Sequence, residues 1–193
     1  MLKFNNKKIL EITWFSRGGQ GAKTSALLFG ESALMAGYYI QAFPEYGPER
    51  AGAPMRVYNR ISPKFIRFRT PVIKPDIVVV LDPTLLKTQV SQIYNLPATF
   101  LINSFTNSLK IKKEQKIKGR VISIDASGLS QEYLGKPIPS IVMLGALIGL
   151  LDFNLKEILP VLKSRLSEKI DPKLVSANIK VIIKTYKLIK NIK

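Results

Sequence analysis

Short apolar runs between polar, glycine or proline residues predict the strands of this chain. Residues 9–15 and 77–81 are almost continuous runs of aliphatic and aromatic residues, which is typical of strands covered on both faces. Residues 38–42, 98–102 and 120–124 are shorter runs with the β-branched and aromatic content of strands.

A hairpin is expected between residues 55–61 and 65–69, with its turn at Ser62-Pro63-Lys64. Polar and apolar residues alternate in the second arm, as in a strand with one wet face. Because side chains two positions apart on a strand share a face, the arginines of this arm should lie together in solvent. A basic cluster is predicted on the hairpin, either as a solvated face or as a site for a ligand, and it consists of Arg56, Arg60, Arg67 and Arg69.

Most segments between the predicted strands have apolar residues at the spacing that is typical of helices. Residues 22–36 predict a helix that ends at Gly37. Asp82-Pro83-Thr84 predicts the start of another helix, because Asp caps helices and Pro suits their first turn. A further helix is expected to run to residue 134 from a cap at Asp125 with Ser127.

Three helical patterns close the chain, over residues 141–151, 155–166 and 172–189. Pro160 should kink the middle helix or mark its true start. Asp171 should cap the last helix, with a proline in its first turn.

Strands that alternate with helices predict a three-layer α/β/α fold with a mostly parallel sheet, which the hairpin makes mixed. No linker or low-complexity segment divides the 193 residues, so a single domain over residues 1–193 is expected. The most apolar run, residues 141–151, is far shorter than the roughly 20 residues that cross a bilayer. Residues 1–8 are polar and basic, unlike a signal peptide. We therefore expect a cytoplasmic protein with no membrane contact.

The sequence contains no cysteine and no histidine, which excludes several kinds of chemistry. It can hold no disulfide, no cysteine-ligated iron–sulfur cluster and no zinc site of the usual kind, and it has no thiol nucleophile or imidazole base. No Gly-x-Ser-x-Gly elbow or other triad spacing occurs among its Ser, Lys, Asp and Glu residues. We expect no catalytic residue and no metal site, and if the chain serves a redox enzyme, the electron carriers belong to other subunits.

A net charge of +17, from 30 Lys and Arg against 13 Asp and Glu, indicates acidic partners or polyanionic ligands. The lysines of residues 110–118 and 180–193 are interleaved with aliphatic residues rather than with aromatic residues on which bases stack. No helix-turn-helix, zinc-finger or RNP-type motif is present. This pattern favours a solvated lysine-rich face or a surface for acidic sister subunits, and it disfavours nucleic acid as a partner.

A glycine-rich turn, RGGQG at residues 17–21, joins the first predicted strand to the first predicted helix. Glycines let the backbone approach a ligand, and N–H groups at a helix start suit phosphate. Two interpretations remain open: the glycines only allow a tight connection, or the turn binds a phosphate with the help of Arg17 and Lys23. The turn lacks the Lys-Ser/Thr ending of a P-loop and is too compressed for a dinucleotide-binding fingerprint.

Residues 42–54 form a proline-rich loop that cannot be a helix, because three prolines each remove a backbone donor. Ordered loops of this length are usually functional. Its charged residues could pair with one another and hold the loop in shape, or the loop could dock on a sister subunit and roof a shared active site with its aromatic residues as anchors. The residues concerned are Phe43, Glu45, Tyr46, Glu49 and Arg50.

Together the two segments resemble the gamma subunit of 2-oxoacid:ferredoxin oxidoreductases of the pyruvate type, the pyruvate synthase family. The resemblance rests on RGGQG at 17–21 and AFPEYGPER at 42–50, and the second string at that distance from the first is the specific part. It continues through GAP at 52–54, PD at 75–76 and MLGA at 143–146, so it spans nearly the whole chain.

The resemblance implies a complex that decarboxylates a 2-oxoacid on thiamine diphosphate, passes electrons through iron–sulfur clusters to ferredoxin and transfers the acyl group to coenzyme A. Thiamine diphosphate, magnesium and the clusters would belong to partner alpha, beta and ferredoxin-like delta subunits, and none to this chain. The chain would pack on the thiamine-bearing subunits and assist coenzyme A. The residues expected to bind coenzyme A phosphate are Arg17, Gly18, Gly19, Gln20, Gly21 and Lys23.

Three alternatives stay open on the sequence. Within the family, the gamma subunit of a branched-chain 2-oxoacid enzyme has no motif that separates it from the pyruvate type. Outside the family, the chain could be a stand-alone nucleotide-binding protein or a basic nucleic-acid-binding domain.

The absence of cysteine and histidine predicts that the chain alone is catalytically silent. Purified by itself, it should bind no iron and reduce no viologen dye in the presence of pyruvate and coenzyme A, as iron analysis and a dye assay would measure. Turnover by the lone chain would contradict its reading as a subunit.

Overall fold

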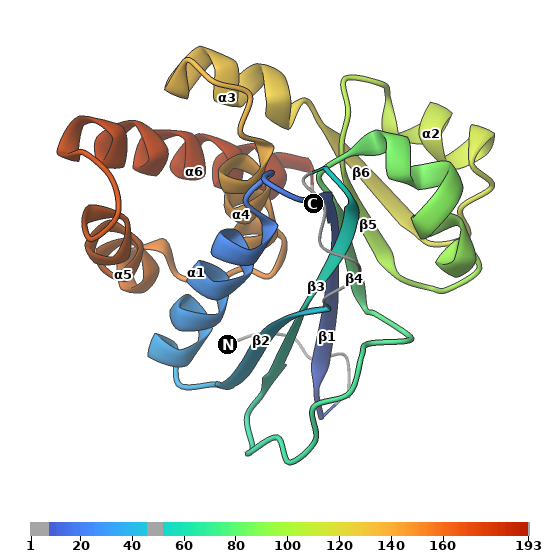
Figure 1. Ribbon diagram of the computed structural model, residues 1–193, viewed down its shortest axis with the longest axis horizontal. Helices are drawn as coiled ribbons and strands as arrows, with labels where there is room; N and C mark the ends of the chain where they lie inside the picture. The colour runs from blue at the N-terminus through green and yellow to red at the C-terminus, as the bar shows by residue number, and fades with distance from the viewer. Residues whose placement is uncertain (1–7, 46–51, 193) are drawn as a thin grey trace.

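The computed structural model describes residues 8–45 and 52–192, and the strands in these ranges form one six-stranded mixed sheet (Figure 1). Its order is β2-β3-β1-β4-β5-β6, and β3 is antiparallel to both of its neighbours, whereas β1, β4, β5 and β6 are parallel. The strands are β1 (Leu10–Arg17), β2 (Tyr39–Glu45), β3 (Pro54–Ser62), β4 (Ile77–Val80), β5 (Thr99–Asn103) and β6 (Arg120–Ile124).

Helices cover both faces of the sheet, which confirms the predicted three-layer fold (Figure 1). One face carries α1 (Ala22–Met35), α3 (Ala126–Leu134), α4 (Pro139–Leu150), α5 (Leu155–Ser167) and α6 (Pro172–Ile192). The opposite face carries α2 (Ser108–Glu114) and the short turns η1 (Pro83–Leu85), η2 (Leu86–Val90) and η3 (Ser91–Ile93).

Helix α4 is the centre of the larger core, and all of its residues are buried. Two glycines let α6 lie directly against it: a Cβ at Gly145 would be 2.7 Å from the Ile182 carbonyl oxygen, and one at Gly149 would be 2.9 Å from that of Tyr186. Both distances are shorter than a carbon–oxygen contact allows, so only glycine permits this backbone approach.

The second arm of the predicted hairpin is wrong, because residues 65–69 form no strand. Strand β3 already has a neighbour on each edge, β2 and β1, so no edge is left for a further arm. The segment instead crosses the face of the sheet opposite α1 and α4. There the Gln41 side-chain amide donates to the Phe68 carbonyl oxygen at 2.8 Å. The sheet is mixed because β3 is antiparallel to both of its neighbours, β2 and β1.

The predicted helix starts are confirmed at Asp82, Asp125 and Asp171, whose carboxylates each accept a backbone N–H two or three residues on. After Asp82, however, the chain forms short 3₁₀ and π turns in place of a regular α-helix. Pro160 lies inside α5, which begins after the Asn154 cap, so the alternative that Pro160 marks the helix start is wrong.

No single helix among the described residues is both long and apolar enough to cross a membrane. Helices α3 and α4 pass that test only as a pair, and they are bent by 114°.

The close contact between α4 and α6 predicts that Gly145→Ala destabilises the chain. Alanine favours a helix over glycine by about 1 kcal/mol, but its Cβ would force two backbones apart at a typical overpacking cost of about 1–3 kcal/mol. The free energy of unfolding, measured by chemical denaturation, should therefore fall. The control Ser176→Ala, on the exposed side of α6, should change it by no more than about 0.5 kcal/mol; equal values for the two variants would refute the argument.

Candidate functional site

The glycine turn lies where β1 ends and α1 begins. Gly19 and Gly21 have φ of +91° and +83°, a left-handed backbone that favours glycine. A Cβ at Gly21 would be 2.5 Å from the Ser140 hydroxyl oxygen, so the turn packs closely against the start of α4. A Cβ at Gly19 would meet nothing within 4 Å, so this residue faces open space.

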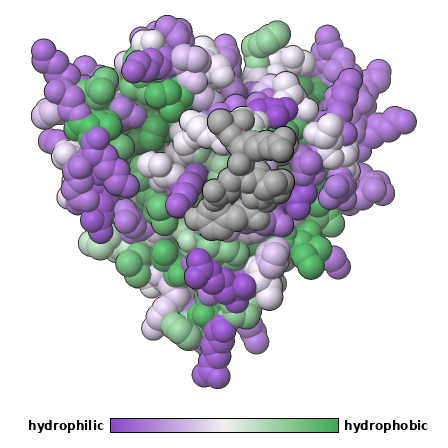
Figure 2. Space-filling view, viewed as in Figure 1, coloured by the Kyte–Doolittle hydropathy of each residue, from purple (hydrophilic) through white to green (hydrophobic). Residues whose placement is uncertain are grey.

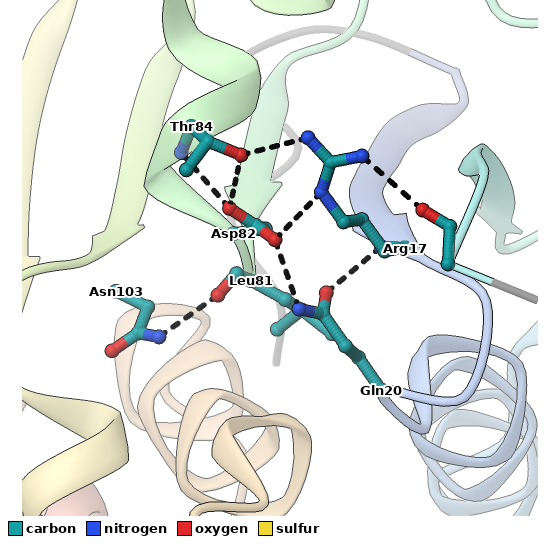
Figure 3. Close-up of polar contacts among 7 residues, drawn as sticks. Arg17, Gln20, Leu81, Asp82, Thr84 and Asn103 are labelled. Atoms are coloured by element: carbon teal, nitrogen blue, oxygen red, sulfur yellow. Dashed lines mark hydrogen bonds and ion pairs between the residues drawn. The ribbon is translucent and has the colours of Figure 1, made fainter.

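Asp82, at the end of β4, is bonded to the residues that shape this turn (Figure 3). Its carboxylate accepts from Arg17 Nε and Gln20 Nε2, each at 3.0 Å. Gln20 Oε1 in turn accepts the Arg17 backbone N–H at 2.8 Å, which closes the turn on itself. The remaining Asp82 oxygen accepts from the Thr84 N–H and hydroxyl, and that hydroxyl accepts from Arg17 Nη2.

The pKa of Asp82 is lowered from its ordinary value of 3.8. Burial acts to raise this pKa, but it is outweighed by the hydrogen bonds from Thr84 and Gln20 and by the charge of Arg17. Asp82 therefore stays ionised and keeps Arg17 in place.

Two helix starts at the turn have no side-chain cap. Gly21 precedes α1 and Ile138 precedes α4. Glycine has no side chain and that of isoleucine is apolar, so neither residue caps its helix through a side chain. The other α-helices in the described residues, α2, α3, α5 and α6, are capped by Asn107, Asp125, Asn154 and Asp171. The partial positive charge of a helix start is thus left without a capping oxygen at both helices that meet at the glycine turn.

The structure brings the predicted turn residues together, with different surroundings for each. The Gly18 N–H donates to the Ala53 carbonyl oxygen at 3.0 Å, so the turn is also bound to the start of β3. Arg17 is half-buried among Asp82, Thr84 and the Gly52 carbonyl oxygen. Lys23 is exposed on the first turn of α1.

Sequence reasoning missed Asn103, which lies at the same edge of the sheet. This side chain, 5% exposed, donates to the Leu81 carbonyl oxygen at 2.8 Å and accepts the Ser127 N–H at 3.1 Å. It therefore joins the end of β4 to the start of α3. Figure 3 shows the bond to Leu81. The sequence signal that could have identified Asn103 is a polar residue directly after an apolar strand.

The predicted loop over residues 42–54 is too long, because its first residues belong to β2, which ends at Glu45, and Pro54 opens β3. Residues 46–51, which include Tyr46, Glu49 and Arg50, lie outside the described residues. Phe43 is 7% exposed and packs on Tyr58, so a docking role for it would require the covering segment to move. Glu45 accepts the Tyr58 hydroxyl and is paired with Arg56 at 3.8 Å. The pKa of Tyr58 is raised to about 12, first by burial and then by the Glu45 carboxylate.

The four arginines of the predicted basic cluster do not form one solvated face. Arg60 is 1% exposed, with its Nε 2.8 Å from the Glu11 carboxylate. Its guanidinium lies over the Phe68 ring at 4.7 Å, while that of Arg69 lies over the Phe43 ring at 5.1 Å. Arg67 is exposed to solvent.

Within residues 8–45 and 52–192, no group of three or more Asp, Glu, His or Cys side chains could hold a metal ion.

Sequence comparison places the chain among known proteins. A family model described as pyruvate ferredoxin/flavodoxin oxidoreductase matches residues 11–188. Pyruvate synthase subunit PorC of Thermotoga maritima is 36% identical over 185 residues, which cover 95% of this chain and 96% of that one. The pyruvate/ketoisovalerate oxidoreductases common subunit gamma of Thermococcus kodakarensis is 40% identical over 140 residues, 72% of this chain and 76% of that one.

Solved structures agree with this placement. The crystal structure of the Thermotoga maritima PORC subunit superposes with a TM-score of 0.79 at 34% identity, over 94% of this chain and 97% of that one. The 2-oxoglutarate:ferredoxin oxidoreductase of Magnetococcus marinus, solved with 2-oxoglutarate, coenzyme A and succinyl-CoA bound, shares the fold at 19% identity and a TM-score of 0.78, over 97% of this chain and 32% of that one.

The fold and the site define an α/β protein in which a glycine turn lies between two helix starts without a side-chain cap, and whose sequence contains no cysteine and no histidine. With the matches above, the chain belongs to the pyruvate ferredoxin/flavodoxin oxidoreductase family, as a gamma-type subunit of a 2-oxoacid:ferredoxin oxidoreductase.

The lowered pKa of Asp82 predicts a pH-dependent contribution to stability. Its charge stabilises the folded chain fully above the ordinary value of 3.8, and this contribution is lost as the pH falls from there through the lowered folded pKa. Asp82→Asn should lower the free energy of unfolding at pH 7 by about 1–2 kcal/mol, since a charged, half-buried pair lies between the usual buried and surface cases.

Chemical denaturation at a series of pH values measures this difference. The gap between the wild type and Asp82→Asn should shrink below about pH 4. Glu114→Gln, which removes an exposed carboxylate from α2, is the matched control and should change stability by less than about 0.5 kcal/mol. A gap for Asp82→Asn that stays constant with pH would show that charge is not what Asp82 contributes.

Proposed function

We propose that the chain serves a pyruvate:ferredoxin oxidoreductase complex by holding a phosphate of coenzyme A at the glycine turn while it packs on the thiamine-bearing subunits. The observation that carries the proposal is the meeting of two uncapped helix starts, those of α1 and α4, at this turn. One helix start contributes up to about 2 kcal/mol toward an anion, while millimolar binding requires about 4 kcal/mol. Two starts side by side therefore reach the required range.

Positive charge near the turn adds to the attraction of the two helix starts. Lys23 extends from the first turn of α1, and the net charge of +17 provides a field that favours anions. Arg17 has a different part in this proposal, because Asp82 and Thr84 already bind its guanidinium. It holds the turn in the shape that presents the N–H groups of residues 18–21 and of the helix start.

Relatives support coenzyme A as the ligand. The Magnetococcus marinus enzyme of the same fold was solved with coenzyme A and succinyl-CoA bound. A helix start favours anions in general, and coenzyme A carries several phosphate charges whereas a 2-oxoacid carries one carboxylate. In this proposal, thiamine diphosphate, magnesium and the iron–sulfur clusters belong to partner alpha, beta and delta subunits. Ferredoxin is the electron acceptor, and the complex works in the cytoplasm.

The choice between pyruvate and a branched-chain 2-oxoacid belongs to another subunit in this proposal. The Thermococcus kodakarensis relative is named as a subunit common to pyruvate and ketoisovalerate oxidoreductases. A subunit common to two enzymes does not discriminate between their substrates, so the gamma-type chain is given a role in the step that both reactions share.

Binding to nucleic acid is disfavoured by the sequence, in which the lysines are interleaved with aliphatic residues and no nucleic-acid-binding motif is present. On the face that Figure 2 shows, hydrophilic and hydrophobic residues are interspersed.

The proposal predicts that a negative charge at Gly19 weakens coenzyme A binding. Gly19 faces open space, so Gly19→Asp and Gly19→Asn fit equally and carry the same backbone strain. In the assembled complex, the coenzyme A KM should be about tenfold higher for Asp than for Asn, which corresponds to about 1.4 kcal/mol of repulsion.

Pyruvate provides the internal control in the same assays. Its KM in the decarboxylation half-reaction should differ by less than about twofold between the two variants. A change in the pyruvate KM with an unchanged coenzyme A KM would assign the turn to the oxoacid and overturn the proposal.

A further inference from the structure

A cavity of about 360 Å³ lies on the outer face of β1 and β3, apart from the coenzyme A proposal above. Its floor is made by Thr13 and Phe15 of β1 with Arg56 and Tyr58 of β3. Residues 71–75 form one wall, and η2 and η3 with Leu96 form the other. Both walls lie on the side of the sheet opposite α1 and α4 (Figure 1). The volume is within the range of small-molecule sites, about 300–1,000 Å³.

The floor holds a buried hydroxyl with an unused hydrogen-bonding capacity. Thr13 is 2% exposed, and its hydroxyl oxygen has no hydrogen-bond partner in the described part of the chain. Thr13 and Phe15 are two apart on β1, so both side chains project from the same face into the cavity. A buried hydroxyl left unbonded costs about 1–3 kcal/mol, and a polar ligand atom above it would remove that cost.

Charges around the cavity favour an anionic ligand. Arg56 and Lys74 line it against a single carboxylate, that of Glu45. Glu45 accepts the Tyr58 hydroxyl and pairs with Arg56, so these two charges offset each other and Lys74 leaves the lining with an excess of one positive charge. The side-chain oxygen of Gln89 accepts a hydrogen bond from Arg56 Nη2 at 3.0 Å. The amide nitrogen of Gln89 is therefore directed away from the arginine.

The rest of the lining is apolar. Phe15, Val72, Ile73, Ile93 and Leu96 contribute hydrocarbon surface. This combination of apolar walls with a few converging polar groups is typical of sites for small amphipathic molecules.

We propose that this cavity binds a small organic monoanion, with a carboxylate toward Thr13, Arg56 and Lys74 and a short branched or cyclic hydrocarbon body against Phe15 and Ile93. The ligand is chemically distinct from a nucleotide phosphate, and the site is on the face of the sheet away from the start of α4.

Three molecules with one skeleton test the charge. The full chain, labelled with ¹⁵N, is titrated by NMR with 3-methylbutanoate, 3-methylbutanamide and 3-methylbutylamine. The carboxylate should give saturable shifts at Thr13, Gln89 and Gln92 with a Kd of about 1 mM, the amide should bind at least about fivefold more weakly, and the amine should not bind. Equal shifts for all three molecules, or shifts spread over the whole surface, would overturn the proposal.

Two pairs of variants locate the site. Thr13→Val keeps the shape and removes the hydroxyl, so the Kd for 3-methylbutanoate should rise about five- to tenfold. Its control is Ser16→Ala, which removes a buried unpaired hydroxyl from the other face of β1 and should leave the Kd unchanged.

The second pair tests charge. Lys74→Gln should weaken binding about two- to threefold. Its control is Lys64→Gln, at an exposed lysine outside the cavity, which should not weaken binding. If Lys64→Gln weakens binding as much as Lys74→Gln, only the net charge attracts the anion and no site exists.

Stability gives a second readout for the Thr13 variant. Without ligand, Thr13→Val should melt at or above the wild-type temperature, because an unpaired buried hydroxyl is removed. With 3-methylbutanoate the order should reverse, since the wild type binds it more tightly. The titration repeated on the assembled complex must still show binding; loss of binding there would mean that a partner subunit fills the cavity, and would overturn the proposal.

These outcomes are separate from those for coenzyme A. Gly19→Asp should leave the Kd for 3-methylbutanoate within about twofold of that for Gly19→Asn, and Thr13→Val should leave the coenzyme A KM unchanged.

Discussion

A single carboxylate, that of Asp82, holds together the edge of the sheet on which the site is built. It is 12% exposed and lies one strand away from the turn that it organises. Parallel pairing of β1 with β4 places the ends of both strands at the same edge, so Arg17 and Asp82 meet although 65 positions separate them. The strand order thus determines the shape of a turn whose own glycines would permit many others.

The same arrangement explains how positive charge is distributed at this edge. The arginine side chain is neutralised where it enters the turn, and the potential that remains comes from peptide dipoles at the starts of α1 and α4. Dipoles fixed by backbone hydrogen bonds need no rearrangement when an anion arrives, whereas a lysine side chain must be ordered. On the proposal that this turn holds coenzyme A, a rigid site of moderate affinity suits a carrier that must bind and leave at each turnover.

Local signals predicted most of the fold. Apolar runs gave the strands, and caps such as Asp82 and Asp125 gave the helix starts, because each depends on neighbours a few residues away. The second hairpin arm failed because pairing depends on which strand edges are vacant, and a sequence window does not contain that information. The burial of Arg60 was missed when it was assigned to the basic cluster of the hairpin, for the same reason: its partners Glu11 and Phe43 are 49 and 17 positions away in the sequence. At the site, the glycine turn was predictable, but the meeting of two uncapped helices required the third dimension.

The fully buried helix α4 has a consequence for the synthesis of the chain. Its cover, α6, begins 22 residues after α4 ends. At about 5–20 residues per second, α6 follows α4 out of the ribosome by a few seconds. During that interval a helix with an apolar surface on every side, and two glycines that weaken it in isolation, has only part of its packing. The nascent chain therefore passes through a stage in which this apolar segment is incompletely covered, and such surface favours aggregation until the last helix completes the core.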